Sequence, residues 1–250
     1  MAHPQSATQI EAIQNQVNAI KWFHRIDLGC GIVTPGDDNS PDKLNQLRFP
    51  DDLTGKTFLD IGAWDGFFSF EAERRHASRV LATDSYVWQG KVPGNSKNGF
   101  LTARSLLNSQ VADKEIDPLE ISPETVGLWD VVLFAGVLYH MKHPLLALER
   151  AASVTKELLI VETITDLEFT RRPAIAFYPG TELNGDSTNW SGVNTVALEA
   201  MLLHLGFHQV VLIRRKPLYR RLLSAGKWMF HGTSPWTTLQ QDRIVLHARR

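Results

Sequence analysis

The stretch that decides the fold of this 250-residue chain is residues 57–70, TFLDIGAWDGFFSF. A mostly apolar run reaches Asp60, a turn follows from Gly62 to Gly66, and an apolar segment begins at Phe67. This order predicts a β-strand, a tight glycine turn and a helix. At such a turn, unpaired backbone N–H groups and the positive end of the helix face the same point. The stretch therefore predicts a site for a nucleotide-like ligand.

A second strand supplies an acid for the same site. Residues 80–84, VLATD, predict a strand that ends in Asp84. A carboxylate in this place can accept hydrogen bonds from two ribose hydroxyls. Dinucleotide-binding turns carry the pattern GxGxxG, whereas this turn is GAWDG, with Trp64 where the middle glycine would stand. The combination favours an adenosine ligand and disfavours a nicotinamide cofactor.

Four later stretches follow in a recognisable order: WDVVLFAGVLYH at 129–140, HPLLALE at 143–149, YPG at 178–180 and ALEAMLLHLGF at 197–207. Together with FLDIGAWDG and Asp84, they resemble the class I S-adenosylmethionine-dependent methyltransferases. More narrowly, they are similar to the tRNA wobble-uridine (mo5U34/carboxymethyl) methyltransferase branch. The resemblance covers roughly residues 50 to 214 and implies S-adenosylmethionine as the cofactor.

The rest of the chain predicts an α/β fold. Strands are expected at 57–61, 79–83, about 114–118, 130–135, 157–162, 209–214 and 243–248, with helices between them. This alternation predicts a Rossmann-like, doubly wound, seven-stranded sheet that is mostly parallel. The resemblance implies that the last strand is antiparallel. We expect an N-terminal helix and cap over 1–50, and a methyltransferase domain over 51–250 with insertions at about 165–193 and 215–240.

Ligands of such sheets bind beyond the carboxyl ends of the strands. Gly62 would let the backbone approach the methionine part of the cofactor, and Asp60 would orient the loop or contact the methionine amine through water. Trp64 would wall the pocket, stack near the sulfonium, or simply belong to the core. The predicted cofactor-binding residues are Asp60, Gly62, Trp64, Asp84, Ser85, Leu119, Glu120, Ala135 and Tyr139.

The stretch FAGVLYH, 134–140, carries the predicted chemistry. His140 has the type and place of a general base, with a helix-start hydrogen bond as the alternative role. In the carboxymethyltransferases that the chain resembles, the tyrosine matching Tyr139 helps to hold the carboxylate of carboxy-S-adenosylmethionine, and an arginine precedes an Asn-aromatic pair. Here Thr188 precedes Asn189 and Trp190, so that arginine is missing. Plain S-adenosylmethionine is therefore favoured over the carboxylated cofactor.

Substrate contacts are expected from two other regions. The resemblance implies that the N-terminal segment lies across the ligand cleft, which makes Trp22 and His24 candidates, although His24 also suits a packing role. Tyr178 and Trp190, in the insertion after the fifth strand, are candidates for a substrate wall.

Composition limits the partners and the compartment. The chain is 43% hydrophobic and 21% charged with a net charge of -1, which gives no overall attraction to nucleic acid or membrane. Its single cysteine, Cys30, rules out an intrachain disulfide and offers no metal cluster. The N-terminus lacks the order of a signal peptide, so a cytoplasmic chain without a membrane partner is expected.

One local exception is basic. Residues 214–227, RRKPLYRRLLSAGK, carry six basic side chains, and no acid occurs between Glu199 and Asp242. This stretch either binds tRNA phosphates or is a solvated surface. We therefore expect a methyltransferase that acts on a small molecule, with a tRNA wobble uridine as the alternative acceptor. A fold that binds S-adenosylmethionine without catalysis is a further alternative.

Overall fold

A computed structural model describes residues 7–229 and 234–250, with only the backbone described for 224–229. The chain divides into two compact units. The N-terminal unit comprises the chain up to Asn45 and Phe49–Asp117, and the C-terminal unit comprises Gln46–Arg48 and Pro118–Arg250. No helix in the described part is long and apolar enough to cross a bilayer.

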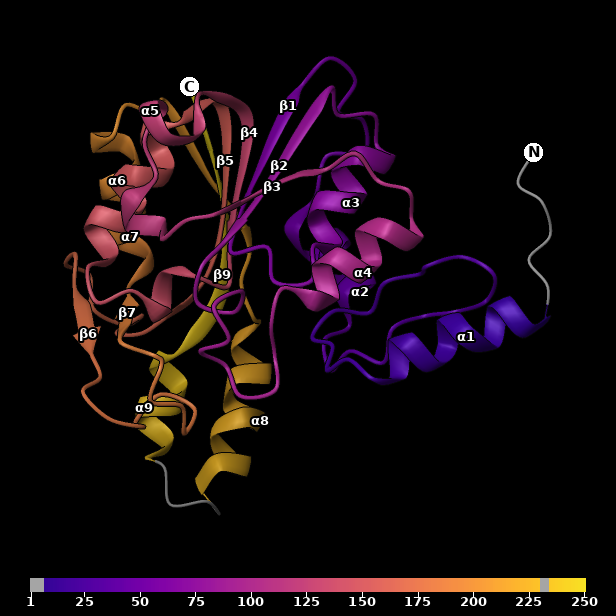
Figure 1. The fold of residues 1–250 in the computed structure, drawn as a ribbon. Coiled ribbons are helices and arrows are strands. Elements are labelled where there is room, and N and C mark those ends of the chain that lie inside the picture. The colour runs from indigo at the N-terminus through magenta and orange to yellow at the C-terminus, as the bar shows by residue number, and fades with distance from the viewer. Residues whose placement is uncertain (1–6, 230–233) are drawn as a thin grey trace. The chain divides into compact units, whose positions relative to one another are not determined.

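The N-terminal unit contains three parallel strands and the helices that connect them (Figure 1). Its elements are α1 (Ala7–Asn18), most of α2 (Ser40–Leu47), β1 (Thr57–Ile61), α3 (Phe67–Arg74), β2 (Arg79–Asp84), α4 (Asn98–Leu106) and β3 (Ala112–Glu115). The register pairs Asp60 with Ala82 and Ile61 with Thr83. The ends of β1 and β2 therefore lie side by side.

The C-terminal unit contains the remaining strands of the sheet and a separate hairpin. Its elements are η1 (Pro118–Glu120), α5 (Pro123–Val126), β4 (Trp129–Ala135), η2 (Leu138–His140), α6 (Pro144–Ser153), β5 (Thr155–Thr165), β6 (Ile175–Phe177), β7 (Ser191–Val193), α7 (Thr195–His204), β8 (Gln209–Arg214), α8 (Leu218–Met229), α9 (Pro235–Gln240) and β9 (Asp242–Arg249). Strands β4 and β5 are buried almost throughout, as expected of parallel strands covered on both faces.

The seven strands follow the order β3-β2-β1-β4-β5-β9-β8. Strand β9 pairs antiparallel with both β5 and β8, which confirms the expected antiparallel last strand. The predicted mostly parallel, doubly wound sheet is therefore confirmed. The two-stranded sheet of β6 and β7 lies within the expected insertion at 165–193 and was not predicted.

Gly66 is a glycine that the turn before α3 requires. Its φ is +86°, and a Cβ built there would lie 2.6 Å from the Phe100 ring and 2.9 Å from Phe70. We expect Gly66→Ala to destabilise the chain by about 2–5 kcal/mol, since backbone strain and overpacking add. Gly29→Ala is the matched control, because Gly29 has φ +85° and open space around it. Urea unfolding of both variants isolates the clash, and equal losses would contradict it.

Candidate functional site

Two backbone hydrogen bonds connect the turn after β1 to β2. The N–H groups of Gly62 and Ala63 both donate to the Thr83 carbonyl, at 2.8 and 2.9 Å. Gly62 has φ +84°, a conformation that glycine adopts without strain. The chain thereby turns away from the sheet edge immediately beside the end of β2.

Asp84 lies at the end of β2 and binds this turn. Its carboxylate accepts a hydrogen bond from the Trp64 N–H at 3.0 Å and one from the Val87 N–H at 3.1 Å. The side chain is buried, and burial raises the pKa of Asp84 although backbone N–H groups, Trp64's first among them, oppose that rise. The backbone N–H groups of Trp88 and Ser85 also act on this carboxylate, so four N–H groups lie around it. The next residue, Ser85, is also buried.

Asp60 is buried one strand away. Its carboxylate accepts a 2.7 Å hydrogen bond from the Ser69 hydroxyl on α3. Burial raises the pKa of Asp60 to about 7; the Ser69 hydrogen bond opposes the rise and the nearby Asp84 adds to it. Asp60 therefore links β1 to α3 beneath the turn, which agrees with a role in orienting the loop.

The raised pKa of Asp60 predicts how stability depends on pH. Between its ordinary value of 3.8 and about 7, folded Asp60 holds a proton that the unfolded chain has lost. Its contribution to stability is therefore complete below pH 3.8 and is lost as the pH rises through about 7. The free energy of unfolding of the unaltered chain should fall by roughly 1.4 kcal/mol per pH unit within that window. Asp60→Asn imitates the protonated form, so we expect this variant not to show that fall.

Urea unfolding at a series of pH values tests this prediction, with Asp113→Asn as the control of opposite sign. Burial raises the pKa of Asp113, but ion pairs with Lys97 and Arg104 outweigh burial and hold this pKa below its usual range. Removing the Asp113 carboxylate should therefore reduce stability at neutral pH. Parallel stability curves for Asp60→Asn and the unaltered chain would contradict the expected titration of Asp60.

Trp64 occupies the middle of the turn in a left-handed conformation, with φ +50°. Its indole stacks on Phe23, with ring centroids 4.3 Å apart. Its carbonyl accepts a 2.8 Å hydrogen bond from the Trp88 indole. The Nε1–H of Trp64 is buried without a hydrogen-bond partner among the described residues. Such an unpaired donor is costly, and a polar ligand atom would satisfy it.

The N-terminal segment is tied to this turn by Asp65, which sequence reasoning did not select. One Asp65 oxygen accepts from the N–H groups of Phe23 at 2.7 Å and His24 at 2.9 Å. Trp22 and His24 are buried, and the Trp22 indole donates to the Val17 carbonyl. Burial lowers the pKa of His24 to about 3. Both candidate substrate residues are therefore buried within the N-terminal unit.

The C-terminal unit brings Ala135, Gly136, Tyr139 and His140 together at the end of β4. Gly136 has φ +73°, and a Cβ there would meet only atoms 3.8 Å or more away, on Arg243 and Tyr139. Ala135 is half-buried, and the space at Gly136 leaves the backbone there accessible at close range.

Tyr139 is packed against a partly buried ion pair. The Arg243 guanidinium lies 5.7 Å from the Tyr139 ring centroid and binds the Glu162 carboxylate through two nitrogens. Burial raises the pKa of Tyr139, while the charge of Arg243 opposes that rise. The positive charge beside Tyr139 is thus already paired with an acid. Sequence reasoning missed this pair because its members are 81 residues apart.

His140 is oriented by Thr188. Its Nδ1 lies 3.0 Å from the Thr188 carbonyl oxygen and 3.1 Å from the Thr188 hydroxyl. A carbonyl oxygen only accepts, so Nδ1 carries the hydrogen. Burial lowers the pKa of His140, and therefore the ring is neutral at pH 7 with a lone pair on Nε2. This is the protonation state that a general base needs.

The predicted substrate wall is only partly exposed. Tyr178 is buried in a cluster with Tyr139, and its hydroxyl donates to Asp166. Trp190 is half-buried. Its backbone N–H donates to the Tyr139 carbonyl at 2.8 Å, and the Lys142 ammonium lies 4.2 Å from the centroid of the indole ring. Trp190 is therefore partly exposed, whereas Tyr178 is buried in the same cluster as Tyr139.

The predicted adenine contacts Leu119 and Glu120 lie in η1. Leu119 is half-buried and the Glu120 side chain is exposed, while the Glu120 carbonyl accepts from the Thr125 hydroxyl at 3.1 Å. A capping box formed by Ser122 and Thr125 fixes the start of α5, and this start marks the end of the η1 segment.

The C-terminal unit has a groove of about 380 Å³, and its first lining residue in the sequence is Lys142, two positions after His140. It is lined by Lys142, His143, Pro144, Leu145, Leu146, Ile175, Phe177 and Ser191. The lining combines apolar side chains with one lysine, and Lys142 and Ser191 directly adjoin the segments that carry His140 and Trp190. Its volume lies within the roughly 300–1,000 Å³ typical of small-molecule sites.

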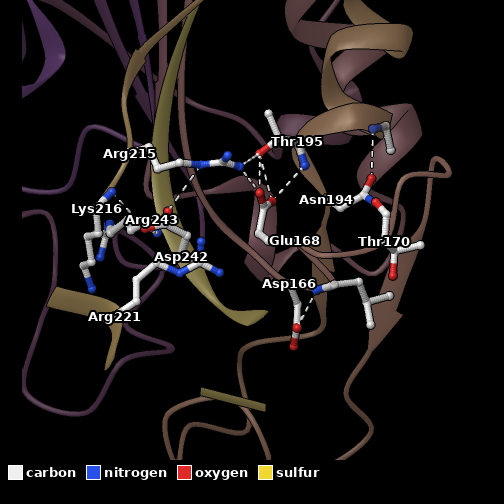
Figure 2. A network of polar contacts seen from close by, with 12 residues as sticks. Asp166, Glu168, Thr170, Asn194, Thr195, Arg215, Lys216, Arg221, Asp242 and Arg243 are labelled. Carbon is white, nitrogen blue, oxygen red and sulfur yellow. Dashed lines mark hydrogen bonds and ion pairs between the residues drawn. The ribbon is translucent and has the colours of Figure 1, made fainter. Parts of the chain in front are cut away.

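Part of the basic stretch 214–227 is engaged within the C-terminal unit. Figure 2 shows Arg215 reaching Glu168 and Thr195, where its guanidinium forms an ion pair with Glu168 and donates to the Thr195 hydroxyl at 2.9 Å. Arg221 is 5% exposed and donates to the Leu239 carbonyl. The side chain of Lys227 lies outside the described residues. These two arginines therefore stabilise the fold.

No protein-family model matches this sequence, and no curated protein matches it. The structure is similar to the N-terminal domain of EvdMO1 solved in the presence of S-adenosylhomocysteine (SAH) and D-fucose, at 17% identity and a TM-score of 0.66, covering 98% of this chain and 99% of that one. This chain has the Rossmann-like fold of that domain, with a mostly parallel seven-stranded sheet. At this identity the likeness shows the fold alone.

Two further structures show how widely this fold is used. Magnesium protoporphyrin IX methyltransferase from Synechocystis PCC 6803, with bound SAH, is 14% identical, with a TM-score of 0.50 and coverage of 100% of this chain and 90% of that one. The [4+2]-cyclase SpnF is 15% identical, with a TM-score of 0.53 and coverage of 96% and 93%. A cyclase with this fold shows that the architecture does not by itself imply methyl transfer.

Proposed function

We propose that this chain is an S-adenosylmethionine-dependent methyltransferase that acts on a small-molecule acceptor. The observation that carries the proposal is the position of Asp84, a buried carboxylate at the end of β2 that accepts a hydrogen bond from the Trp64 N–H of the glycine turn. That is the arrangement an adenosine ribose needs. The structures with the same fold that contain SAH support it.

The residues present fit this cofactor. The unpaired Nε1–H of Trp64 offers a donor at the turn, and Gly62 and Gly136 keep two stretches of backbone bare. Asp84 would hold the ribose, with Ser85, Leu119 and Glu120 proposed for the adenine. Asp60, Ala135 and Tyr139 are proposed for the methionine part. S-adenosylmethionine supplies an electrophilic methyl group on a sulfonium.

His140 gives the chain a group that can accept a proton. Its neutral ring keeps a lone pair on Nε2 while Nδ1–H donates to Thr188, so Nε2 can take the proton of an acceptor O–H or N–H. Thr188 thus orients the base. Two features disfavour the carboxylated cofactor. Thr188 replaces the expected arginine, and Arg243 is already paired with Glu162.

The groove that starts in the sequence at Lys142 supports a small acceptor. Leu145, Ile175 and Phe177 offer an apolar surface, while Lys142 adds one positive charge. A partly apolar molecule with a polar or anionic group fits this lining. A tRNA acceptor draws less support, since Arg215 and Arg221 of the basic stretch are bound within the protein.

The proposal is tested by measuring SAH release from S-adenosylmethionine with a panel of small phenols, acids and amines, and separately with bulk tRNA. We expect release with at least one small acceptor and much less with His140→Gln. Release with tRNA alone would assign the alternative acceptor. Tight SAH binding without release from any acceptor would indicate a binding protein or another reaction on this fold.

A further inference from the structure

Helix α8 exposes an apolar face. Leu218, Tyr219, Leu222 and Leu223 are 56%, 58%, 53% and 71% exposed. Their spacing of one, four and five residues places them on one side of the helix. An apolar stripe of this kind normally faces a core, and a contiguous exposed one indicates an interaction site.

On the side of α8 opposite the exposed leucines, a buried arginine holds the helix against its own unit. Arg221 donates to the Leu239 carbonyl of α9, and its guanidinium lies 5.2 Å from the Phe169 ring centroid. Phe169 in turn packs against Trp236 of α9, with ring centroids 5.4 Å apart. The helix therefore turns a charged residue inward and its leucines outward. Figure 1 shows α8 and α9 together at one end of the C-terminal unit.

The surroundings of this face are positive. No acid occurs between Glu199 and Asp242, and the exposed Lys216 and Arg220 flank the leucines. A second copy of the chain would bring like charges together, and a nucleic acid would leave the leucines in water. An anionic lipid surface accepts both the apolar and the basic side chains.

We propose that α8 docks the protein peripherally on an anionic membrane surface. Leu222 and Leu223 enter the boundary between headgroups and acyl chains, Tyr219 lies at the interface, and Lys216 and Arg220 contact the anionic headgroups. No helix among the described residues is long and apolar enough to cross a bilayer, and peripheral docking does not require one. Peripheral docking needs one amphipathic helix, and it does not depend on the proposed enzymatic activity.

Sedimentation of the full chain with vesicles tests the proposal. We expect binding to phosphatidylcholine vesicles that contain about 30% phosphatidylserine, and little binding to phosphatidylcholine alone, because the attraction depends on anionic lipid. Leu222→Ser with Leu223→Ser should weaken binding at least about tenfold, since two apolar side chains no longer insert. Arg220→Gln should weaken it about fivefold.

Leu203→Ser with Leu145→Ser is the matched control, because these leucines are 53% and 46% exposed on α7 and α6. We expect this pair to leave binding unchanged and all variants to melt at the same temperature. Absence of binding to the anionic vesicles would overturn the proposal, as would equal loss in both leucine pairs. Dimers that dissociate on Leu222→Ser with Leu223→Ser, without vesicle binding, would assign the face to a second copy instead.

Discussion

His140→Gln is expected to lower kcat by about 10²- to 10⁴-fold, the usual contribution of a positioned general base. The cause is specific to Nε2, because Thr188 fixes Nδ1 as the donor and leaves Nε2 as the free acceptor. SAH binding should be unchanged, since the predicted ribose and turn contacts are untouched. His204→Gln, on the exposed end of α7, is the matched control and should keep full activity.

The same variant predicts a change in the pH profile. Burial lowers the pKa of His140 from 6.5, so the neutral, active form persists below that pH and is lost only as the pH falls further. The acidic limb of kcat/KM should therefore lie below pH 6.5 in the unaltered chain and disappear in His140→Gln. An unchanged kcat would show that His140 only hydrogen-bonds Thr188 and that the acceptor needs no base.

Asp84→Ala is expected to weaken binding of S-adenosylmethionine and SAH by about 10- to 150-fold, equivalent to roughly 1.5–3 kcal/mol for hydrogen bonds to a charged acceptor. The loss includes the contacts to the ribose and the release of the turn at Trp64. Calorimetric titration measures it, and circular dichroism establishes that the variant is folded.

Asp113→Ala is the control for Asp84→Ala, because it removes a carboxylate with two partners from the neighbouring strand β3. Its affinity for SAH should match that of the unaltered chain. Equal affinity for Asp84→Ala would show that β2 carries no ribose contact. The ligand would then have to bind elsewhere on the fold.

Sequence patterns predicted the sheet because its signals are local. The runs 57–61 and 209–214 became β1 and β8 with the expected bounds. The expected antiparallel final strand, known only from the resemblance, was also confirmed. Strand β6 escaped prediction since three residues, 175–177, are too short to show a period of two.

The supporting contacts of the site could not be predicted in the same way. Asp65 binds the backbone of His24 across 41 residues, and Thr188 meets His140 across 48. Neither pair has a spacing that a local pattern could reveal. The burial of Trp22 and His24 likewise depends on Asp65 drawing the N-terminal segment onto the turn. The acid in GAWDG was the one available signal for this contact.

The central claim is that the glycine turn and Asp84 bind S-adenosylmethionine. Calorimetric titration of the full chain with S-adenosylmethionine, SAH, carboxy-S-adenosylmethionine and NAD in parallel tests it most directly. We expect the first two to bind, the carboxylated cofactor to bind more weakly and NAD not to bind. Binding of NAD in place of SAH, or no binding of SAH at all, would contradict the account.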